Sequence, residues 1–208
     1  MSTNDAHRVT TVEQLRAIVG ESSPLTQHKL LSALDDTARE FIARSPFVLL
    51  GTADAAGHQD VSPKGDAPGF VAVEDDTTLL IPDRKGNRLI FGLQNILANP
   101  RVGLLFLLPG TGETLRVNGT AEITTDPAIL SRLSARRQPA LLAIRVRVLE
   151  CFFHCAKALL RAQLWQPETW AERFRVSFGT LLVTRMGADA ELAESIDRVI
   201  EEDYKTGL

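Results

Sequence analysis

Positive charge and turn-forming residues gather in a short segment at residues 82–88. Arg84, Lys85 and Arg88 surround a glycine directly before a stretch of helical periodicity. The free backbone N–H groups at a helix start, together with the helix dipole, favour an anion such as phosphate. The segment therefore predicts a phosphate-binding turn. The alternative is a charged surface turn in which Asn87 caps the helix.

A second polar segment lies at residues 60–66, where a predicted strand ends. Pro63 removes a donor from the strand ladder, and Gly65 permits a tight bend. Ser62 can offer a hydroxyl, and Lys64 a positive charge, to a phosphate or to an electron-rich ring edge. The alternative is an exposed loop lysine without a ligand.

The segment 113–119 alternates polar and aliphatic residues with a period of two. This period predicts a strand that places Thr114, Arg116 and Asn118 on one face. A polar face of this kind suits contact with a ligand or another subunit. Alternatively, Arg116 is a surface charge on an outward face.

The stretch 150–165 combines aromatic, thiol and basic residues and predicts a helix over 151–164. Helical spacing then aligns four residues on one stripe, namely His154, Lys157, Arg161 and Trp165. Such a stripe offers charge and stacking to an anionic aromatic ligand. The alternative is a half-exposed helix whose long cations cover apolar surface, with the indole in the core.

The two cysteines, Cys151 and Cys155, are four residues apart in this predicted helix. That spacing separates their Cβ atoms by roughly 5–6 Å, too far for an unstrained disulfide, which fits a reducing compartment. They do not make a zinc site with His154, because no second Cys/His pair completes a tetrahedron. We therefore expect buried, unreactive thiols and no metal.

Composition limits the classes of partner. The chain has 208 residues with 44% hydrophobic residues, which suits one domain with a real core, and a formal net charge of -3. Nucleic-acid and polybasic membrane binders need a dense cationic face, so neither partner is expected. The first residues include no apolar signal segment, and no stretch reaches the ~18–20 apolar residues of a spanning helix, so a cytoplasmic protein is expected.

Periodicity predicts seven short strands with few long crossovers, a pattern typical of an antiparallel barrel. Helices are predicted before, between and after these strands, with Gly20 and Pro46 as stops and with Asp35 or Asp36 and Asp126 as N-caps. The predicted strands are 47–53, 58–63, 69–73, 77–81, 101–108, 113–124 and 140–149; the predicted helices are 11–19, one that follows its cap at Asp35 or Asp36 and ends at Pro46, 87–97, 127–135, 151–164 and 188–203.

Several motifs in this order resemble the pyridoxamine 5′-phosphate oxidase-like FMN-binding proteins. The motifs are Ser-Pro-Phe-Val-Leu-Leu-Gly-Thr at 45–52, Ser-Pro-Lys at 62–64, Gly-Asn-Arg at 86–88, Asn-Pro-Arg-Val-Gly-Leu-Leu-Phe at 99–106 and Leu-Arg-Val-Asn-Gly-Thr-Ala-Glu at 115–122. The resemblance implies a mainly β (α+β) fold, a six-stranded antiparallel split β-barrel with N- and C-terminal helices. It also implies an obligate homodimer with FMN in clefts between subunits.

Carried over by position, the resemblance implies twelve cofactor-binding residues. Ser62, Pro63 and Lys64 would lie along the flavin, Arg84, Asn87 and Arg88 would hold the phosphate, Thr114 and Arg116 would reach the ring edge, and His154, Lys157, Arg161 and Trp165 would close the far side. Pyridoxamine phosphate oxidases proper carry an Arg-x-His substrate motif near their C-terminal end. This chain ends in an acidic helix instead, which argues against vitamin B6 oxidation.

The sequence therefore predicts one domain over residues 1–208, with a helical extension at 1–46, a barrel at 47–150 and helices at 151–208. The favoured function is an FMN-dependent oxidoreductase that passes hydride or electrons between a donor such as NAD(P)H and a small molecule. Lys64 or Arg116 would stabilise the anion that forms on reduction, and no catalytic side chain is assigned. The alternative is a non-catalytic protein of the same fold that binds FMN, haem or a deazaflavin, with His154 as a haem ligand.

Overall fold

The computed structural model describes residues 7–207. The expectation that the first residues include no signal segment falls partly on residues 1–6, which lie outside this range. None of the helices within 7–207 combines the length and the apolarity that crossing a bilayer requires.

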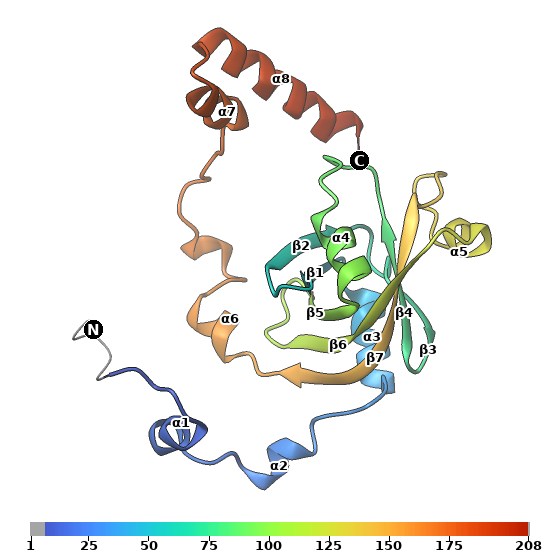
Figure 1. The fold of residues 1–208 in the computed structure, drawn as a ribbon, viewed down its shortest axis with the longest axis vertical. Helices are drawn as coiled ribbons and strands as arrows, with labels where there is room; N and C mark the ends of the chain where they lie inside the picture. The colour runs from blue at the N-terminus through green and yellow to red at the C-terminus, as the bar shows by residue number, and fades with distance from the viewer. Residues whose placement is uncertain (1–6, 208) are drawn as a thin grey trace.

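Seven antiparallel strands form one sheet in the order β2-β1-β5-β6-β7-β4-β3 (Figure 1). All seven predicted strands are present, and the mainly β architecture with helices is confirmed. The pairing leaves β2 and β3 as the two edges, so the sheet has seven strands and is not closed by hydrogen bonds as a six-stranded barrel. The strands are β1 (Phe47–Ala53), β2 (Gln59–Gly65), β3 (Ala72–Asp75), β4 (Thr78–Asp83), β5 (Arg101–Leu107), β6 (Thr114–Thr124) and β7 (Leu142–His154).

Alternation along the central strands builds the core. In β6, Leu115 and Val117 are fully buried, whereas Arg116 between them is exposed, as the period of two predicts. A bulge shifts the register with β7 between Asn118 and Gly119. A Cβ on Gly119 would lie 2.1 Å from the Arg147 carbonyl oxygen, so only glycine permits the two strands to approach here.

The helices begin and end largely at the predicted signals. Asp35 caps α3 by accepting from the Ala38 N–H at 2.8 Å, and Asp126 caps α5 in the same way. Pro46 follows the end of α3, and Gly20 ends α1 at φ 82°. The α-helices are α1 (Val12–Val19), α2 (Pro24–Gln27), α3 (Asp36–Arg44), α4 (Phe91–Ala98), α5 (Pro127–Arg132), α6 (Lys157–Arg161), α7 (Phe178–Met186) and α8 (Ala190–Thr206), with a 3₁₀ turn η1 (Pro167–Thr169).

The predicted helix from residue 151 is wrong, because β7 continues to His154 and α6 begins at Lys157. The pairing of β4 with β7 ends at Thr78 and Arg147. Beyond Arg147, the side of β7 that faces β4 is therefore free to pair with another segment. Leu31 takes the place, and its backbone exchanges two hydrogen bonds with Cys151 at 2.8 and 3.0 Å. Tertiary pairing therefore outweighs the helical pattern of this stretch.

The cysteine prediction fails with that helix. Cys151 is buried in β7, where its thiol donates to the Ala33 carbonyl at 3.2 Å, and burial, with the charges of Asp35 and Glu150, raises its pKa. Cys155 follows the strand and is exposed. Both thiols are free, as expected, but only Cys151 is buried.

The two ends of the chain leave the sheet as extended arms (Figure 1). The first arm holds α1 and α2. The second runs from residue 155 through α6 to the α7–α8 hairpin. In this hairpin α8 was predicted from the sequence, whereas α7 was not. The helices α7 and α8 pack extensively only against each other, while the sheet with α3 and α4 contains the main core.

Candidate functional site

A cavity of about 880 Å³ lies between β2, the turn after β4 and the start of α4. This volume is within the usual range for small-molecule and cofactor sites. We call it the β2–α4 cavity. Its lining includes six of the twelve predicted residues, namely Ser62, Pro63, Lys64, Arg84, Asn87 and Arg88.

One face of β2 supplies a row of polar groups to this cavity. Asp60, Ser62 and Lys64 are half-buried, whereas Val61 and Pro63 between them are exposed, as the alternation of a strand requires. Because β2 is an edge strand, Pro63 can occupy it without breaking a central ladder. Asp60 was not among the predicted site residues, although the period that selects Ser62 and Lys64 also selects it.

Two ion pairs connect the end of β2 to the turn after β4. Lys64 Nζ lies 2.7 Å from Asp83 Oδ1, and Arg84 Nε lies 3.1 Å from Asp66 Oδ2. All four side chains are partly buried, so solvent screens these pairs less than pairs on an open surface. Lys64 and Arg84 are therefore held in place by carboxylates on opposite walls. Sequence inspection missed these partners, because no local pattern links residues 18 or 19 positions apart.

The turn at residues 84–90 is not the helix start that the sequence predicts. α4 begins at Phe91, and Asn87 accepts a hydrogen bond from the Leu89 N–H at 3.0 Å instead of capping the helix. Arg88 has φ 60°, a left-handed conformation that costs a non-glycine residue on the order of 1–3 kcal/mol. Within residues 7–207, neither Lys85 nor Arg88 has a carboxylate partner, so the turn retains positive charge.

The start of α4 closes the cavity against β1 and β2. A Cβ on Gly92 would lie 3.3 Å from Asp60 Oδ2 and 3.8 Å from Ser62 Oγ, so a glycine here keeps the helix close to the polar row. Asn95 Nδ2 donates to the buried Thr52 Oγ1 at 3.1 Å and fixes the helix on β1. The polar groups of β2 thus lie on rigid elements, whereas the cationic turn is exposed.

The other six predicted residues lie elsewhere. The register places Lys64 opposite Val48 and, through β5 and β6, in the same row as Phe153 of β7. Four strand spacings separate the two strands, about 19 Å along the sheet. None of these six residues lines the β2–α4 cavity of the same chain; this second group consists of Thr114, Arg116, His154, Lys157, Arg161 and Trp165.

Contacts within the second group differ from the predicted helical stripe. The Arg116 guanidinium lies 5.1 Å from the Phe152 ring centroid, and Thr114 is buried opposite His154 in the β6–β7 ladder. Trp165 Nε1 donates to the Thr111 carbonyl at 2.8 Å, which fixes the segment after α6 to the β5–β6 turn. His154 belongs to a strand, so the stripe of four helical residues is wrong.

A smaller cavity of about 340 Å³ lies where the N-terminal arm crosses the end of β7. It brings Lys29, His154 and Cys155 together with the two phenylalanines of β7. No group of three or more His, Cys, Asp or Glu side chains in the described part of the chain could hold a metal ion.

The sequence model of the pyridoxamine 5′-phosphate oxidase family matches residues 34–155, more than half of the chain. The chain belongs to the pyridoxamine 5′-phosphate oxidase family. The matched region of this family member contains the whole lining of the β2–α4 cavity and ends before α6. No curated protein matches the chain.

Solved structures similar to this family member include three bacterial proteins. HupZ of Group A Streptococcus is 20% identical, with 58% of this chain and 93% of that chain covered and a TM-score of 0.48. A Clostridium acetobutylicum protein related to general stress protein 26 is 16% identical, with 57% and 86% covered and a TM-score of 0.45. An FMN-binding protein from Syntrophomonas wolfei is 13% identical, with 68% and 95% covered and a TM-score of 0.42.

Proposed function

We propose that the protein binds FMN in the β2–α4 cavity and acts as an FMN-dependent oxidoreductase. The observation that supports this most is the convergence of Ser62, Pro63 and Lys64 with Arg84, Asn87 and Arg88 around one cavity of suitable size. The segments 62–64 and 84–88 are about twenty positions apart in the sequence. The sequence predicts that each of them contacts an anion or a flavin. Membership of the pyridoxamine 5′-phosphate oxidase family supports the same ligand.

The charges of the cavity fit a phosphate at the turn and a ring along β2. Arg88 and Lys85 have no carboxylate partner within residues 7–207, and the Asp66 carboxylate orients the Arg84 guanidinium, so a phosphate would meet three cations. Ser62 and Lys64 would contact the ring system, with Asp83 holding the ammonium group in position. The bound flavin would supply hydride and electron transfer.

Lys64 has a further role in this proposal. A cation beside the pyrimidine edge of the ring stabilises the negative charge that reduction places there. In the half-buried site such a charge interaction is stronger than in water. Lys64 would therefore favour the reduced, anionic cofactor, and no side chain of the cavity needs to act as a nucleophile.

We propose a split-barrel homodimer in which the second group of predicted residues reaches the cavity of the partner subunit. Within one chain neither Arg116, three strands from Lys64 in the sheet order, nor His154, four strands away, lines the β2–α4 cavity. A two-fold dimer would bring the two groups together. Each of its two sites would then combine the β2–α4 cavity of one subunit with the second group of residues from the other subunit. A small-molecule substrate and an electron donor such as NAD(P)H would enter between the walls.

The test is a titration of the purified protein with FMN and with riboflavin, followed by anaerobic addition of NADPH. We expect FMN to bind at one equivalent per chain, more tightly than riboflavin, and its absorbance at the flavin maximum to bleach on reduction. A Soret band from bound haem, or a preference for a deazaflavin, would support the alternative of a different ligand in the same fold. Absence of binding to all three would overturn the proposal.

The dimeric site has its own test. We expect Lys157→Ala and Arg161→Ala to weaken FMN binding while leaving the melting temperature of the ligand-free protein nearly unchanged, because exposed cations usually change stability by less than about 0.5 kcal/mol. Light scattering that finds a monomer with stoichiometric FMN would contradict the shared site.

A further inference from the structure

The α7–α8 hairpin is a compact unit that is nearly detached from the sheet. A Cβ on Gly179 would lie 2.0 Å from the Ala193 carbonyl oxygen, so the two helices cross with their backbones in contact. Asp197 accepts from the Gly179 N–H at 2.8 Å and from the Ser177 hydroxyl, which ties α8 to the start of α7. Extensive packing with any strand of the sheet is absent from the described residues.

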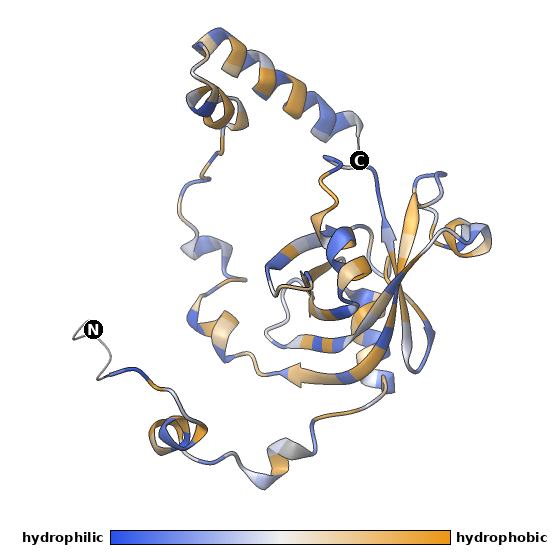
Figure 2. Cartoon of the chain, viewed as in Figure 1, coloured by the Kyte–Doolittle hydropathy of each residue, from blue (hydrophilic) through white to orange (hydrophobic). Residues whose placement is uncertain are grey.

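This hairpin leaves large apolar side chains uncovered. Hydrophobic and hydrophilic residues alternate along both of its helices (Figure 2). Met186 and Val199 are each 67% exposed. The other large exposed hydrophobic side chains of the hairpin are Phe178, Leu181, Leu182, Leu192 and Tyr204. Where exposed apolar side chains adjoin one another, they usually mark a protein–protein contact.

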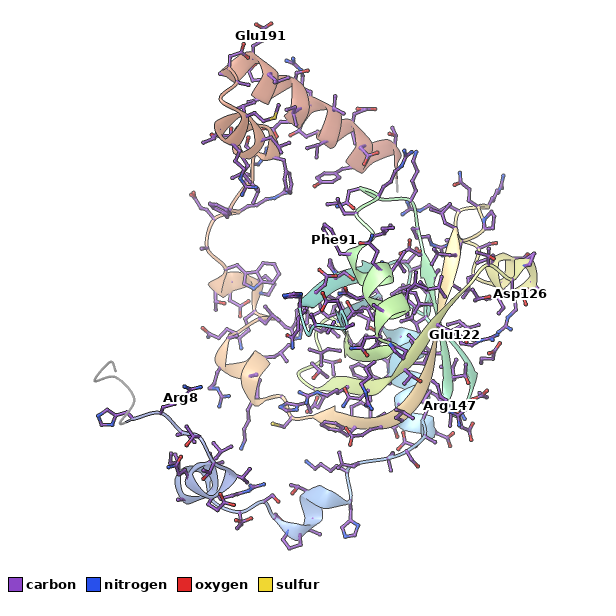
Figure 3. The ribbon with its side chains drawn as sticks, viewed as in Figure 1. Arg8, Phe91, Glu122, Asp126, Arg147 and Glu191 are labelled. Carbon is purple, nitrogen blue, oxygen red and sulfur yellow. The ribbon has the colours of Figure 1, made fainter. Side chains whose placement is uncertain are left out.

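A second uncovered apolar surface surrounds the mouth of the β2–α4 cavity. Figure 3 marks Phe91 at the start of α4, next to the cationic turn. We call this surface the cavity rim, and its exposed members are Val61, Leu89, Ile90, Phe91 and Leu141.

The charges around the two surfaces are opposite. Residues 177–206 contain seven acidic and three basic side chains, whereas residues 84–88 contain three basic and no acidic ones. Glu202 and Asp203 follow Val199 by three and four positions, so they flank the apolar band of α8. Lys85 and Arg88 flank Leu89 of the rim. The acidic character also argues against an anionic membrane as the partner of the hairpin.

We propose that the α7–α8 hairpin of one copy docks on the cavity rim of a second copy of this chain. In a two-fold dimer each copy supplies one hairpin and one rim. The dimer therefore contains two equivalent hairpin–rim contacts, and neither surface stays uncovered on either copy. Complementary charge then sets the orientation of the contact.

Chain continuity permits the hairpin to reach the rim of the second copy, and this argument rests on the proposed function. There, residues 154–165 of each copy reach the partner's cavity. The twelve residues from Trp165 to Ser177 span at most about 40 Å, long enough for the hairpin that follows to reach the rim of the same partner. Docked on the rim, it covers the mouth of the cavity and keeps water from the ligand.

The experiment uses two full-length charge-reversal variants in the ligand-free state. The rim variant is Lys85→Glu with Arg88→Glu, and the hairpin variant is Glu202→Lys with Asp203→Lys. Each is prepared alone, and the two are also co-expressed with different affinity tags. Sedimentation gives the dissociation constant for self-association, and hydrogen exchange gives the protection of residues 177–206. The matched control is Glu168→Lys with Glu172→Lys, which makes the same charge change between α6 and α7.

We expect each variant alone to associate, or to protect its hairpin, at least about tenfold less than the unmodified protein, because like charges then face each other. In the mixed dimer each rim again meets a hairpin of opposite charge, so association and protection should return. The control should behave as the unmodified protein. No loss in either variant, or a loss that mixing does not repair, would overturn the proposal; the second result would place the contact within one chain.

FMN titration of the hairpin variant and of the mixed dimer separates the two proposals. If association returns in the mixed dimer but no FMN binds, the docking surface is supported and FMN is rejected as the ligand. FMN binding without repair does the reverse.

Discussion

The sheet and the C-terminal arm use similar residues in different ways. In the sheet, Lys64 and Arg84 of the β2–α4 cavity are each held by a carboxylate from another element, and many aliphatic side chains are fully buried. In the arm, Lys157 and Arg161 are exposed, and the hairpin leaves Met186 and Val199 largely uncovered. The family match covers the sheet and stops before α6. The sheet therefore buries its apolar side chains within one chain, whereas the hairpin does not.

The largest contrast should come from truncating one phenylalanine in each region. Phe106 is fully buried in β5, and Phe106→Ala should destabilise the protein by about 3–5 kcal/mol, because a large cavity remains. Phe178 in α7 is 43% exposed, and Phe178→Ala should cost under about 1 kcal/mol in dilute protein. Urea denaturation measures both. A cost for Phe178→Ala that grows with protein concentration would sharpen the contrast, because it would locate that side chain in a contact between copies.

A second test concerns the cationic turn of the cavity. Arg88→Ala should weaken FMN binding by about 1.5–3 kcal/mol and riboflavin binding much less, because a charge-assisted contact to the phosphate is lost. Arg137→Ala is a matched control, since Arg137 also has a positive φ (65°) but does not line the cavity. Isothermal titration with both ligands gives the comparison. Equal losses for FMN and riboflavin would count against the phosphate assignment.

The different accessibility of Cys151 and Cys155 tests the boundary between the sheet and the C-terminal arm. Burial raises the pKa of Cys151, so this thiol stays protonated near pH 7 and is shielded, whereas Cys155 is exposed. A disulfide reagent should therefore label one thiol per native chain quickly and the second only on unfolding. Cys151→Ala should cost about 1–2 kcal/mol without loss of FMN, and Cys155→Ala almost nothing. Fast labelling of Cys151 would mean that β7 opens at this end.

The smallest expected effect is a pH dependence confined to the hairpin. The Ser177 hydroxyl and then the Gly179 N–H lower the pKa of Asp197 below its ordinary value. A lowered folded-state pKa stabilises the hairpin above the unfolded pKa, and this contribution is lost as the pH falls through the folded pKa. NMR of the Gly179 amide should show the loss in acid, and Asp197→Asn should show it already at neutral pH. Equal pH sensitivity of sheet amides would contradict a local origin.

The sequence by itself determined most of the strands and several of the helix ends. Strand-forming residues bounded by turn residues are a local signal, so they located all seven strands approximately, and the caps Asp35 and Asp126 act within three residues of their own positions. It also selected Ser62, Lys64, Arg84 and Arg88, because charge next to turn residues is visible in one short segment.

Only the tertiary structure decided which of these residues meet. The pairing of Lys64 with Asp83 depends on two strands at opposite ends of the sheet order, and the extension of β7 through Cys151 depends on Leu31, which is 120 positions away. The same geometry separated His154 and Trp165 from the cavity, although a helical period had aligned them with other cations. Local patterns record the preference of a segment for helix or strand. Contacts between distant segments depend instead on the register of the sheet and on which segment pairs with each open strand edge.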